Sequence, residues 1–206
     1  LLLRLSEAGE PAILWGRQAG PHVGRGFERL LDRGVLVEQA PAIDWDVCPE
    51  CDCGLDARPI QKINGRHIAA CPTDRRSDVV LGDDDLRNFR IHPPALVREI
   101  AMASGFGEEP SPVAAGVWHL GQTSSQRALF IALWRDAVLQ PGMIGLMRSL
   151  ALSLPVTLIA PALAANDFAR FVEAGISVVS IEACLSGNAT SFAIDLSTLA
   201  SAPVLE

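Results

Sequence analysis

The stretch VTLIAPALAANDFARFVEAGISVVSIEACL, residues 156–185, decides the fold class of this chain. Two short apolar runs, 156–161 and 176–185, flank a segment with the spacing of an amphipathic helix. Asn166 is expected to cap this helix and Gly175 to end it. Continuously apolar strands are typical of parallel sheets covered by helices. The stretch therefore predicts a strand, a helix and a second strand.

The flanking segments extend this pattern. Residues 115–134 predict two strands around the polar turn GQTSSQ, residues 142–155 predict a helix, and residues 188–199 predict a last strand. We therefore expect an α/β (or α+β) fold, in which residues 113–206 form a C-terminal mixed sheet covered by helices.

Four of the five cysteines lie close together in the first half of the chain. Cys48 to Cys51 forms a C-x2-C turn, and Cys71 to Asp74 has the same shape with Asp in place of the second cysteine. Between these turns, Asn64-Gly65 stands between two strand-like runs, which is a strong hairpin signal. Zinc prefers about four thiolate or imidazole ligands in tetrahedral geometry. The spacing predicts a metal site.

Two C-x2-C-type turns on either side of a hairpin resemble a zinc ribbon. This chain departs from the zinc-ribbon pattern at the fourth ligand, where Asp74 replaces a cysteine. We expect one structural zinc ion, because no H-x-E or H-E-x-x-H motif supplies a catalytic base. Two disulfides or a redox-active pair are the alternatives. The expected ligands are Cys48, Cys51, Cys53 and Cys71, with His67 and Asp74 as alternates for the fourth position.

Residues 1–46 predict a helix at 1–9, a short helix within 11–20, a helix within 24–34 and a strand at 35–39. This order resembles a winged helix-turn-helix domain. The resemblance implies that the third helix enters the major groove of DNA and brings Arg25 and Arg29 to it, with His22 at the helix start. The acidic residues Glu28 and Asp32 on the same helix favour the alternative of a helical cap packed on the rest of the chain.

The predicted domains are 1–46 (helical, winged-helix-like), 47–106 (zinc-ribbon-like hairpin plus helices) and 113–206 (α/β). Within the second domain, Asp83 is expected to cap a helix. Pro93 and Pro94 are expected to open a second helix, which Gly105 ends.

The formal net charge is −7, and none of the segments 1–47, 48–100 and 101–206 is net basic, so bulk attraction to nucleic acid or anionic membrane has no support. No apolar run approaches the roughly 18 residues that a membrane span needs. Four clustered cysteines in an odd total favour a reducing cytoplasm with a metal site over a secreted disulfide framework. The protein is expected to be bacterial. The sequence begins without Met and is expected to be trimmed or part of a longer protein.

The sequence shows no recognisable combination of catalytic residues. We therefore favour a non-catalytic role and expect a zinc-stabilised regulatory or adaptor protein. Its partner would be a protein or nucleic acid, and the C-terminal domain would sense a ligand or mediate assembly, including as a homo-oligomer. One alternative is an enzyme or ligand-binding domain with Glu182, His119 and the 121–126 turn near one cleft, or with Cys184 and His119 as a nucleophile and base. A second alternative is a subunit or fragment of a larger assembly.

Overall fold

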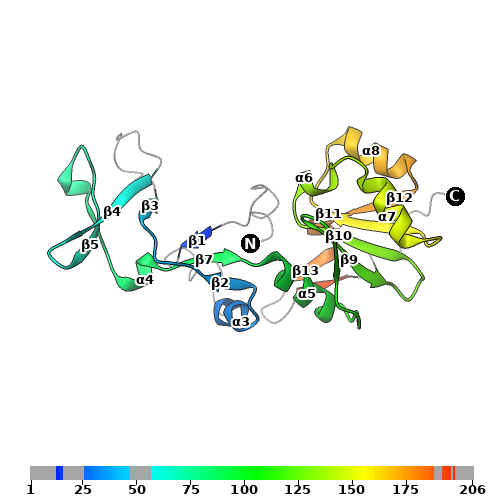
Figure 1. Ribbon diagram of the computed structural model, residues 1–206, viewed down its shortest axis with the longest axis horizontal. Helices are drawn as coiled ribbons and strands as arrows, with labels where there is room; N and C mark the ends of the chain where they lie inside the picture. The colour runs from blue at the N-terminus through cyan, green and yellow to red at the C-terminus, as the bar shows by residue number, and fades with distance from the viewer. Residues whose placement is uncertain (1–12, 16–25, 47–56, 188–191, 196, 198–206) are drawn as a thin grey trace. The chain divides into compact units, whose positions relative to one another are not determined.

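The computed structural model describes residues 13–15, 26–46, 57–187, 192–195 and 197 (Figure 1). Contacts divide the chain into two compact units. The C-terminal unit contains residues 32–35 and the described residues from 92 onward, and the N-terminal unit contains the described residues of 13–31 and 36–91. The domain boundaries expected from the sequence stay predictions.

Five strands form the sheet of the C-terminal unit, in the order β12-β11-β10-β9-β8. The neighbours β10, β11 and β12 run parallel, whereas β9 pairs antiparallel with both β10 and β8. The strands are β8 (Ser111–Ala114), β9 (Val117–Gln122), β10 (Ala128–Ala132), β11 (Val156–Ala160) and β12 (Ile176–Ser180). The expectation of a mixed C-terminal sheet with helices is confirmed.

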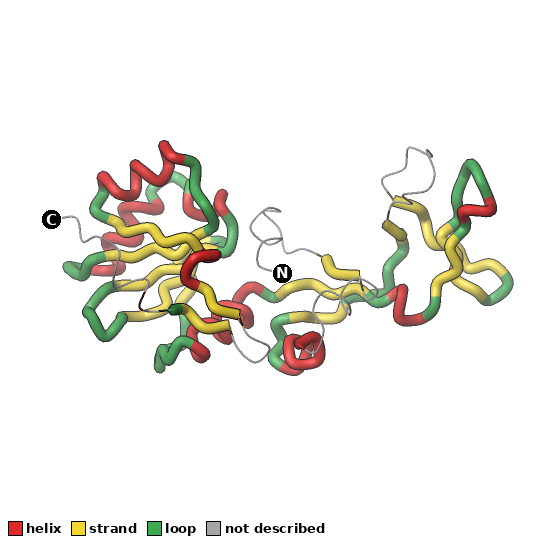
Figure 2. Tube along the Cα trace, turned by 180° about the vertical axis from the view of Figure 1, so that it is seen from behind, coloured by secondary structure: helices red, strands yellow, loops and turns green. Residues whose placement is uncertain are grey.

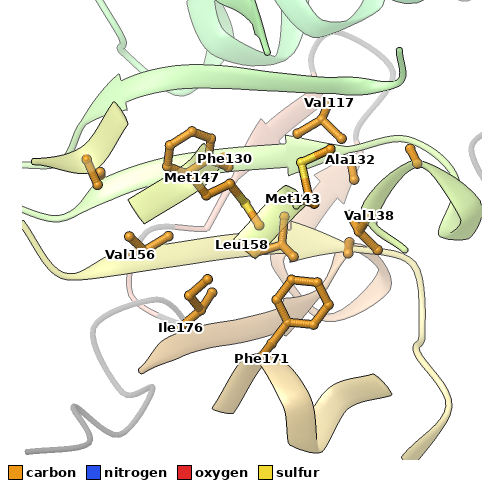
Figure 3. Close-up of a cluster of buried hydrophobic side chains, with 14 residues drawn as sticks. Val117, Phe130, Ala132, Val138, Met143, Met147, Val156, Leu158, Phe171 and Ile176 are labelled. Atoms are coloured by element: carbon orange, nitrogen blue, oxygen red, sulfur yellow. The ribbon is translucent and has the colours of Figure 1, made fainter. Parts of the chain in front are cut away.

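Helices α6 (Arg135–Val138) and α7 (Met143–Ala151) connect β10 to β11, and α8 (Ala165–Glu173) connects β11 to β12 (Figure 2). Their apolar sides meet one face of the sheet in a buried cluster (Figure 3). Burying each large side chain of such a cluster contributes about 1.5–3 kcal/mol. The cluster includes Phe130, Met143, Met147, Leu158, Phe171 and Ile176.

The sequence predicted the C-terminal end of α8 correctly but not its N-terminal cap. Gly175 follows the helix with a φ of 74°, the left-handed conformation that favours glycine there. The predicted Asn166 cap is wrong, because the chain already enters the helix at Ala165, after an extended Ala164. Asn166 therefore lies inside the first turn, where its side chain cannot cap the helix.

The chain after β12 departs from the predicted strand at 176–185. Ser180 ends the strand, and its hydroxyl accepts the backbone N–H of Glu182, which starts the short helix α9 (Ile181–Cys184). This local capping bond competes with continued pairing. An antiparallel hairpin of β13 (Leu185–Gly187) and β14 (Phe192–Ile194) follows.

Helix α5 (Pro93–Ala103) precedes this sheet in the chain and packs against β14. Prolines occupy its first positions and Gly105 follows it with a φ of 82°, as the sequence predicts. The Ser104 hydroxyl accepts the backbone N–H of Ile194 at 2.8 Å, so a hydrogen bond joins the end of α5 to β14.

The N-terminal unit contains an antiparallel three-stranded sheet in the order β1-β7-β2. These strands are β1 (Ile13–Trp15), β2 (Leu36–Glu38) and β7 (Asn88–Ile91). The predicted strand at 35–39 is confirmed. The short helix expected within 11–20 is wrong at 13–15, because this apolar segment pairs with β7 instead. The helix expected at 1–9 lies outside the described residues.

Helix α3 (Phe27–Asp32) matches the helix predicted within 24–34. The ring of Phe27 meets that of Phe89 edge to face with 4.9 Å between centroids, and Leu30 is buried. Gly34 has a φ of 66° and lets the chain turn from the helix into β2.

Strands β2 and β7 continue as a connecting ladder formed by residues 39–42 and 86–88. Gln39 donates its backbone N–H to the Asn88 carbonyl at 3.0 Å, and Ala42 donates to Leu86 at 2.8 Å. The buried Asn88 side chain donates to the Ala40 carbonyl at 2.8 Å. The ladder therefore ties together two segments separated by more than forty residues.

A four-stranded antiparallel sheet, in the order β3-β4-β5-β6, lies in the chain between the two sides of this ladder. Its small core combines buried Ala69, Leu81 and Leu86 with partly buried Trp45, Ile60 and Val79. The strands are β3 (Asp44–Asp46), β4 (Ala57–Ile63), β5 (Arg66–Ala69) and β6 (Val79–Leu81).

Helix α4 (Asp83–Leu86) follows β6, and its expected cap at Asp83 is wrong. Gly82 occupies the N-cap position, and the Asp85 carboxylate reaches back to accept the Gly82 backbone N–H at 2.9 Å. The Asp85 carboxylate thus provides a hydrogen-bond acceptor for a backbone N–H at the start of the helix, and Asp83 is the first helical residue. Within the described residues, no helix is both long enough and apolar enough to cross a bilayer.

Candidate metal centre and nucleic-acid interface

The hairpin of β4 and β5 lies directly before Cys71 in the chain, one of the predicted metal ligands. Asn64 and Gly65 both have positive φ, 50° and 78°, which is the backbone of a tight two-residue hairpin turn. The predicted hairpin is thereby confirmed. Strand β5 ends at Ala69, and Cys71 follows two residues later, buried and at the start of a turn.

The turn at Cys71 directs polar groups at its sulfur. The backbone N–H of Asp74 donates to Cys71 Sγ at 3.4 Å, and the Thr73 hydroxyl lies 3.3 Å from the same sulfur. The Asp78 carboxylate accepts the Cys71 backbone N–H at 2.7 Å and holds the turn in place. Hydrogen bonds from surrounding groups orient the ligands of a metal site. The surroundings of Cys71 therefore fit a metal ligand.

The two alternate ligands lie in different settings. Asp74 is exposed, and its carboxylate accepts the Arg76 backbone N–H at 2.9 Å, which caps the short 3-10 helix η2 (Arg75–Ser77). His67 is half-buried on β5, between Lys62 on β4 and Leu81 on β6. His67 and Ala69 share one face of the strand, since they are two residues apart.

Three of the four expected ligands, Cys48, Cys51 and Cys53, lie outside the described residues. Among the residues that are described, no group of three or more His, Cys, Asp or Glu side chains could hold a metal ion. The zinc site therefore stays a prediction, and Cys71 is its one described thiol.

Arg58 is a feature of this region that the sequence did not reveal. It lies on β4, has no exposed surface, and donates from Nη1 to the Ser77 carbonyl at 2.5 Å. This bond ties β4 to the end of η2, beside the Cys71 turn. A buried guanidinium is rare, and no local pattern separates Arg58 from an exposed arginine.

Of the two predicted nucleic-acid contacts, Arg29 lies on α3. Arg29 is exposed on this helix together with Glu28 and Asp32, and Arg25 lies outside the described residues. The next arginine, Arg33, makes an ion pair with Glu99 at 3.4 Å. Arg29 is thus the described basic side chain that α3 presents to solvent, and acidic neighbours flank it.

The polar groups considered for a C-terminal cleft do not come together. The 121–126 turn precedes β10, at the N-terminal ends of the parallel strands, whereas Glu182 follows the C-terminal end of β12. His119 lies on β9, three strands away from β12 in the sheet order. Neighbouring strands are about 4.8 Å apart, so these groups are spread over the sheet.

Cys184 is unsuited to nucleophilic chemistry. It is buried on α9, and its burial raises the pKa of the thiol to about 12. The carboxylates of Glu182 and Asp195 add to this shift. The thiol therefore stays protonated near neutral pH, and its separation from His119 leaves it without the proposed base.

Arg127 is a second polar feature that sequence reasoning missed. It is buried just before β10, and it donates to the Thr157 hydroxyl at 2.9 Å and the Ser177 hydroxyl at 2.7 Å. These hydroxyls stand on β11 and β12, so one guanidinium bridges the starts of three parallel strands. Thr157 and Ser177 are small polar residues within largely apolar strands, and this pattern could have indicated a buried polar partner.

Comparison with protein-family models, with curated proteins and with solved structures yields no match to this chain.

Proposed function

We propose that this protein is a non-catalytic, zinc-stabilised regulatory or adaptor protein that contacts nucleic acid through its N-terminal unit. The observation that carries the proposal is the β1-β7-β2 sheet with α3 packed against Phe89 just before β2. In winged-helix domains a strand follows the helix that enters the major groove. Here α3 leads into β2, whose partner β7 lies on the order of fifty residues later in the chain.

In this proposal the zinc ion is structural. Cys71 would be one ligand, and Cys48, Cys51 and Cys53 would supply the others, with His67 and Asp74 as alternates. The small core of the four-stranded sheet supports this role, because a sheet with few buried apolar side chains gains folding free energy from a metal. Zinc–thiolate bonds also suit the reducing cytoplasm, where we place the protein.

The C-terminal unit would mediate assembly, as a homo-oligomer or with a protein partner, or sense a ligand. The non-catalytic role is supported by the protonated state of the Cys184 thiol and by the spread of Glu182, His119 and the 121–126 turn. The separation of these groups counts against the enzyme alternative, which places them near one cleft.

The test is fluorescence anisotropy of the zinc-loaded protein with labelled duplex DNA, at low and moderate salt. We expect binding that weakens steeply with salt, and a double substitution Arg25→Ala/Arg29→Ala that lowers the slope of log K against log salt by about one for each arginine. The matched control is Arg148→Ala/Arg170→Ala, which removes the same charge from the C-terminal unit and should leave binding unchanged.

Absence of binding at roughly tens of micromolar protein and low salt would contradict the nucleic-acid role, since even non-specific binding reaches that range. The partner would then be a protein, as the net charge of −7 favours.

A further inference from the structure

Arg127 is a buried cation that no acid of the described residues neutralises. It is 6% exposed, whereas the ion pairs of the described residues belong to Arg33, Arg87 and Arg170. Its side-chain hydrogen bonds go to two hydroxyl groups, which carry no net charge. Buried charges in proteins are almost always paired, because an ion loses its hydration on burial. A negative partner is therefore expected beside this guanidinium.

The Arg127 side chain crosses one face of the sheet at the amino ends of the parallel strands. Ala128 and Phe130 belong to the apolar cluster under α6, α7 and α8. Arg127 alternates with Ala128 and so points to the opposite face, where it meets Thr157 and Ser177. Neighbouring strands are about 4.8 Å apart, so a side chain that starts before β10 must extend across β11 to reach β12. This extended conformation fixes the position of the guanidinium.

The two hydroxyls occupy only one edge of the Arg127 guanidinium. Nε donates to the Thr157 hydroxyl at 2.9 Å and Nη2 donates to the Ser177 hydroxyl at 2.7 Å. Both hydrogens of Nη1 and the second hydrogen of Nη2 have no acceptor among the described residues. Nη1 is not fully enclosed by protein. Nη1 and Nη2 together form the end of the guanidinium fork, which binds two oxygens of one carboxylate or phosphate group side by side.

The backbone of Arg127 is also held in place, by the turn at residues 123–126. Its N–H donates to the Thr123 hydroxyl at 3.2 Å, and its carbonyl accepts the Thr123 backbone N–H at 3.0 Å. Residues 124–126 are exposed, so Arg127 lies at the margin of the sheet, beside solvent. A donor that is fixed through both backbone and side chain loses little freedom when a ligand binds, which favours binding.

We infer that Arg127 anchors an anion-binding site in the C-terminal unit, whose ligand presents a carboxylate or phosphate group to Nη1 and Nη2. The ligand neutralises the buried charge, and its two oxygens accept the open N–H donors. The site lies at the amino ends of the parallel strands, whereas Glu182 follows the carboxyl end of β12, so it is separate from the cleft considered for an enzyme. The inference rests on the part of the proposed function in which the C-terminal unit senses a ligand, and it names the chemistry of that ligand.

The experiment measures the Tm of the zinc-loaded full chain in sodium phosphate, sodium acetate and sodium chloride at equal ionic strength. A ligand that binds only the folded state raises the Tm as its concentration increases. We expect phosphate or acetate to raise the Tm above its value in chloride, and Arg127→Met, which keeps a long side chain without the charge, to lose this rise. Arg148→Met removes an exposed arginine of α7 and should keep it. The general stabilising effect of phosphate is common to all variants, so the difference between variants is the measure. A larger rise in phosphate identifies a phosphate ligand, and a larger rise in acetate identifies a carboxylate.

A second variant separates lost binding from lost folding. Arg127→Lys keeps the charge but not the fork, and it should weaken anion binding about tenfold. An equal anion effect in wild type and both Arg127 variants, or no effect in wild type, would overturn the inference. Binding of labelled duplex DNA is measured on the same proteins. Intact DNA binding without an anion effect would overturn this inference alone, whereas an anion effect that depends on Arg127, without DNA binding, would overturn the nucleic-acid role alone.

Discussion

At the scale of single residues, the two described cysteines differ in what surrounds the sulfur. The Cys71 sulfur accepts a backbone N–H from Asp74, whereas the Cys184 sulfur is buried and its pKa is raised to about 12. The raised pKa keeps Cys184 a protonated thiol near neutral pH. The cysteine spacing also separates the two residues, because Cys71 belongs to the predicted zinc cluster and Cys184 does not; that zinc site stays a prediction.

His119 contributes a pH dependence to the stability of the C-terminal unit. Its ring lies 4.8 Å from that of Phe130, and burial lowers its pKa below the ordinary 6.5, opposed by the negative charge of Glu108. The folded protein therefore binds this proton less readily than the unfolded chain does. Stability is fully present above about pH 6.5 and falls as the pH drops below that value.

Urea unfolding at pH 7.5 and pH 5.0 measures this effect. We expect His119→Phe to lose less stability between the two pH values than wild type does, because it keeps the ring contact without a titrating group. Glu108→Gln should make the loss larger, since it removes the charge that favours the protonated form. An equal loss in wild type and His119→Phe would contradict the assignment.

At the scale of elements, the turn between β8 and β9 depends on a glycine. Gly116 has a φ of 81°, and a Cβ atom there would stand 2.3 Å from Trp134 Cε2 and 2.8 Å from the Ala137 Cβ. We expect Gly116→Ala to lower the free energy of unfolding by about 3 kcal/mol or more, because it combines backbone strain with overlap against a packed indole ring.

Gly175→Ala is the matched control for this substitution, measured by the same denaturant titration. Its φ is 74°, similar to that of Gly116, but no atom lies within 4 Å of the added methyl group. It should cost only the strain of the left-handed conformation, about 1 kcal/mol. Equal costs at both positions would show that the indole ring moves aside.

At the scale of the whole molecule, the two units differ in how they are stabilised. The C-terminal unit has a large apolar cluster between its helices and its sheet, whereas the four-stranded sheet of the N-terminal unit has a small one. If zinc supports that sheet, its removal should affect one unit and spare the other.

Hydrogen exchange followed by mass spectrometry tests this, with and without a zinc chelator. We expect chelation to speed exchange in peptides from residues 57–81 and to leave peptides from 117–132 and 156–180 protected. Cys71→Ser should show the fast exchange without chelator, and Cys184→Ser should respond to chelator as wild type does. Equal loss of protection in both units, or no loss in either, would contradict a structural zinc confined to the N-terminal unit.

Elements with strong local signals could be predicted from the residues alone. The apolar runs at β11 and β12, the helix before Gly175 and the Asn64-Gly65 hairpin were all predictable, because each depends on residues within a turn or a strand. The metal site that the cysteine spacing predicts, with Cys71 as one ligand, stays a prediction.

The pairing of distant segments and the burial of polar groups became clear from the folded chain alone. β1 pairs with β7 although some seventy residues separate Ile13 from Asn88 in the sequence, and that pairing turned an expected helix into a strand. The burial of Arg58 and Arg127, and the separation of His119 from Glu182, follow from the order of strands in the sheets. The physical reason is that strand pairing and burial depend on the packing of the whole chain, which no local pattern of residues contains.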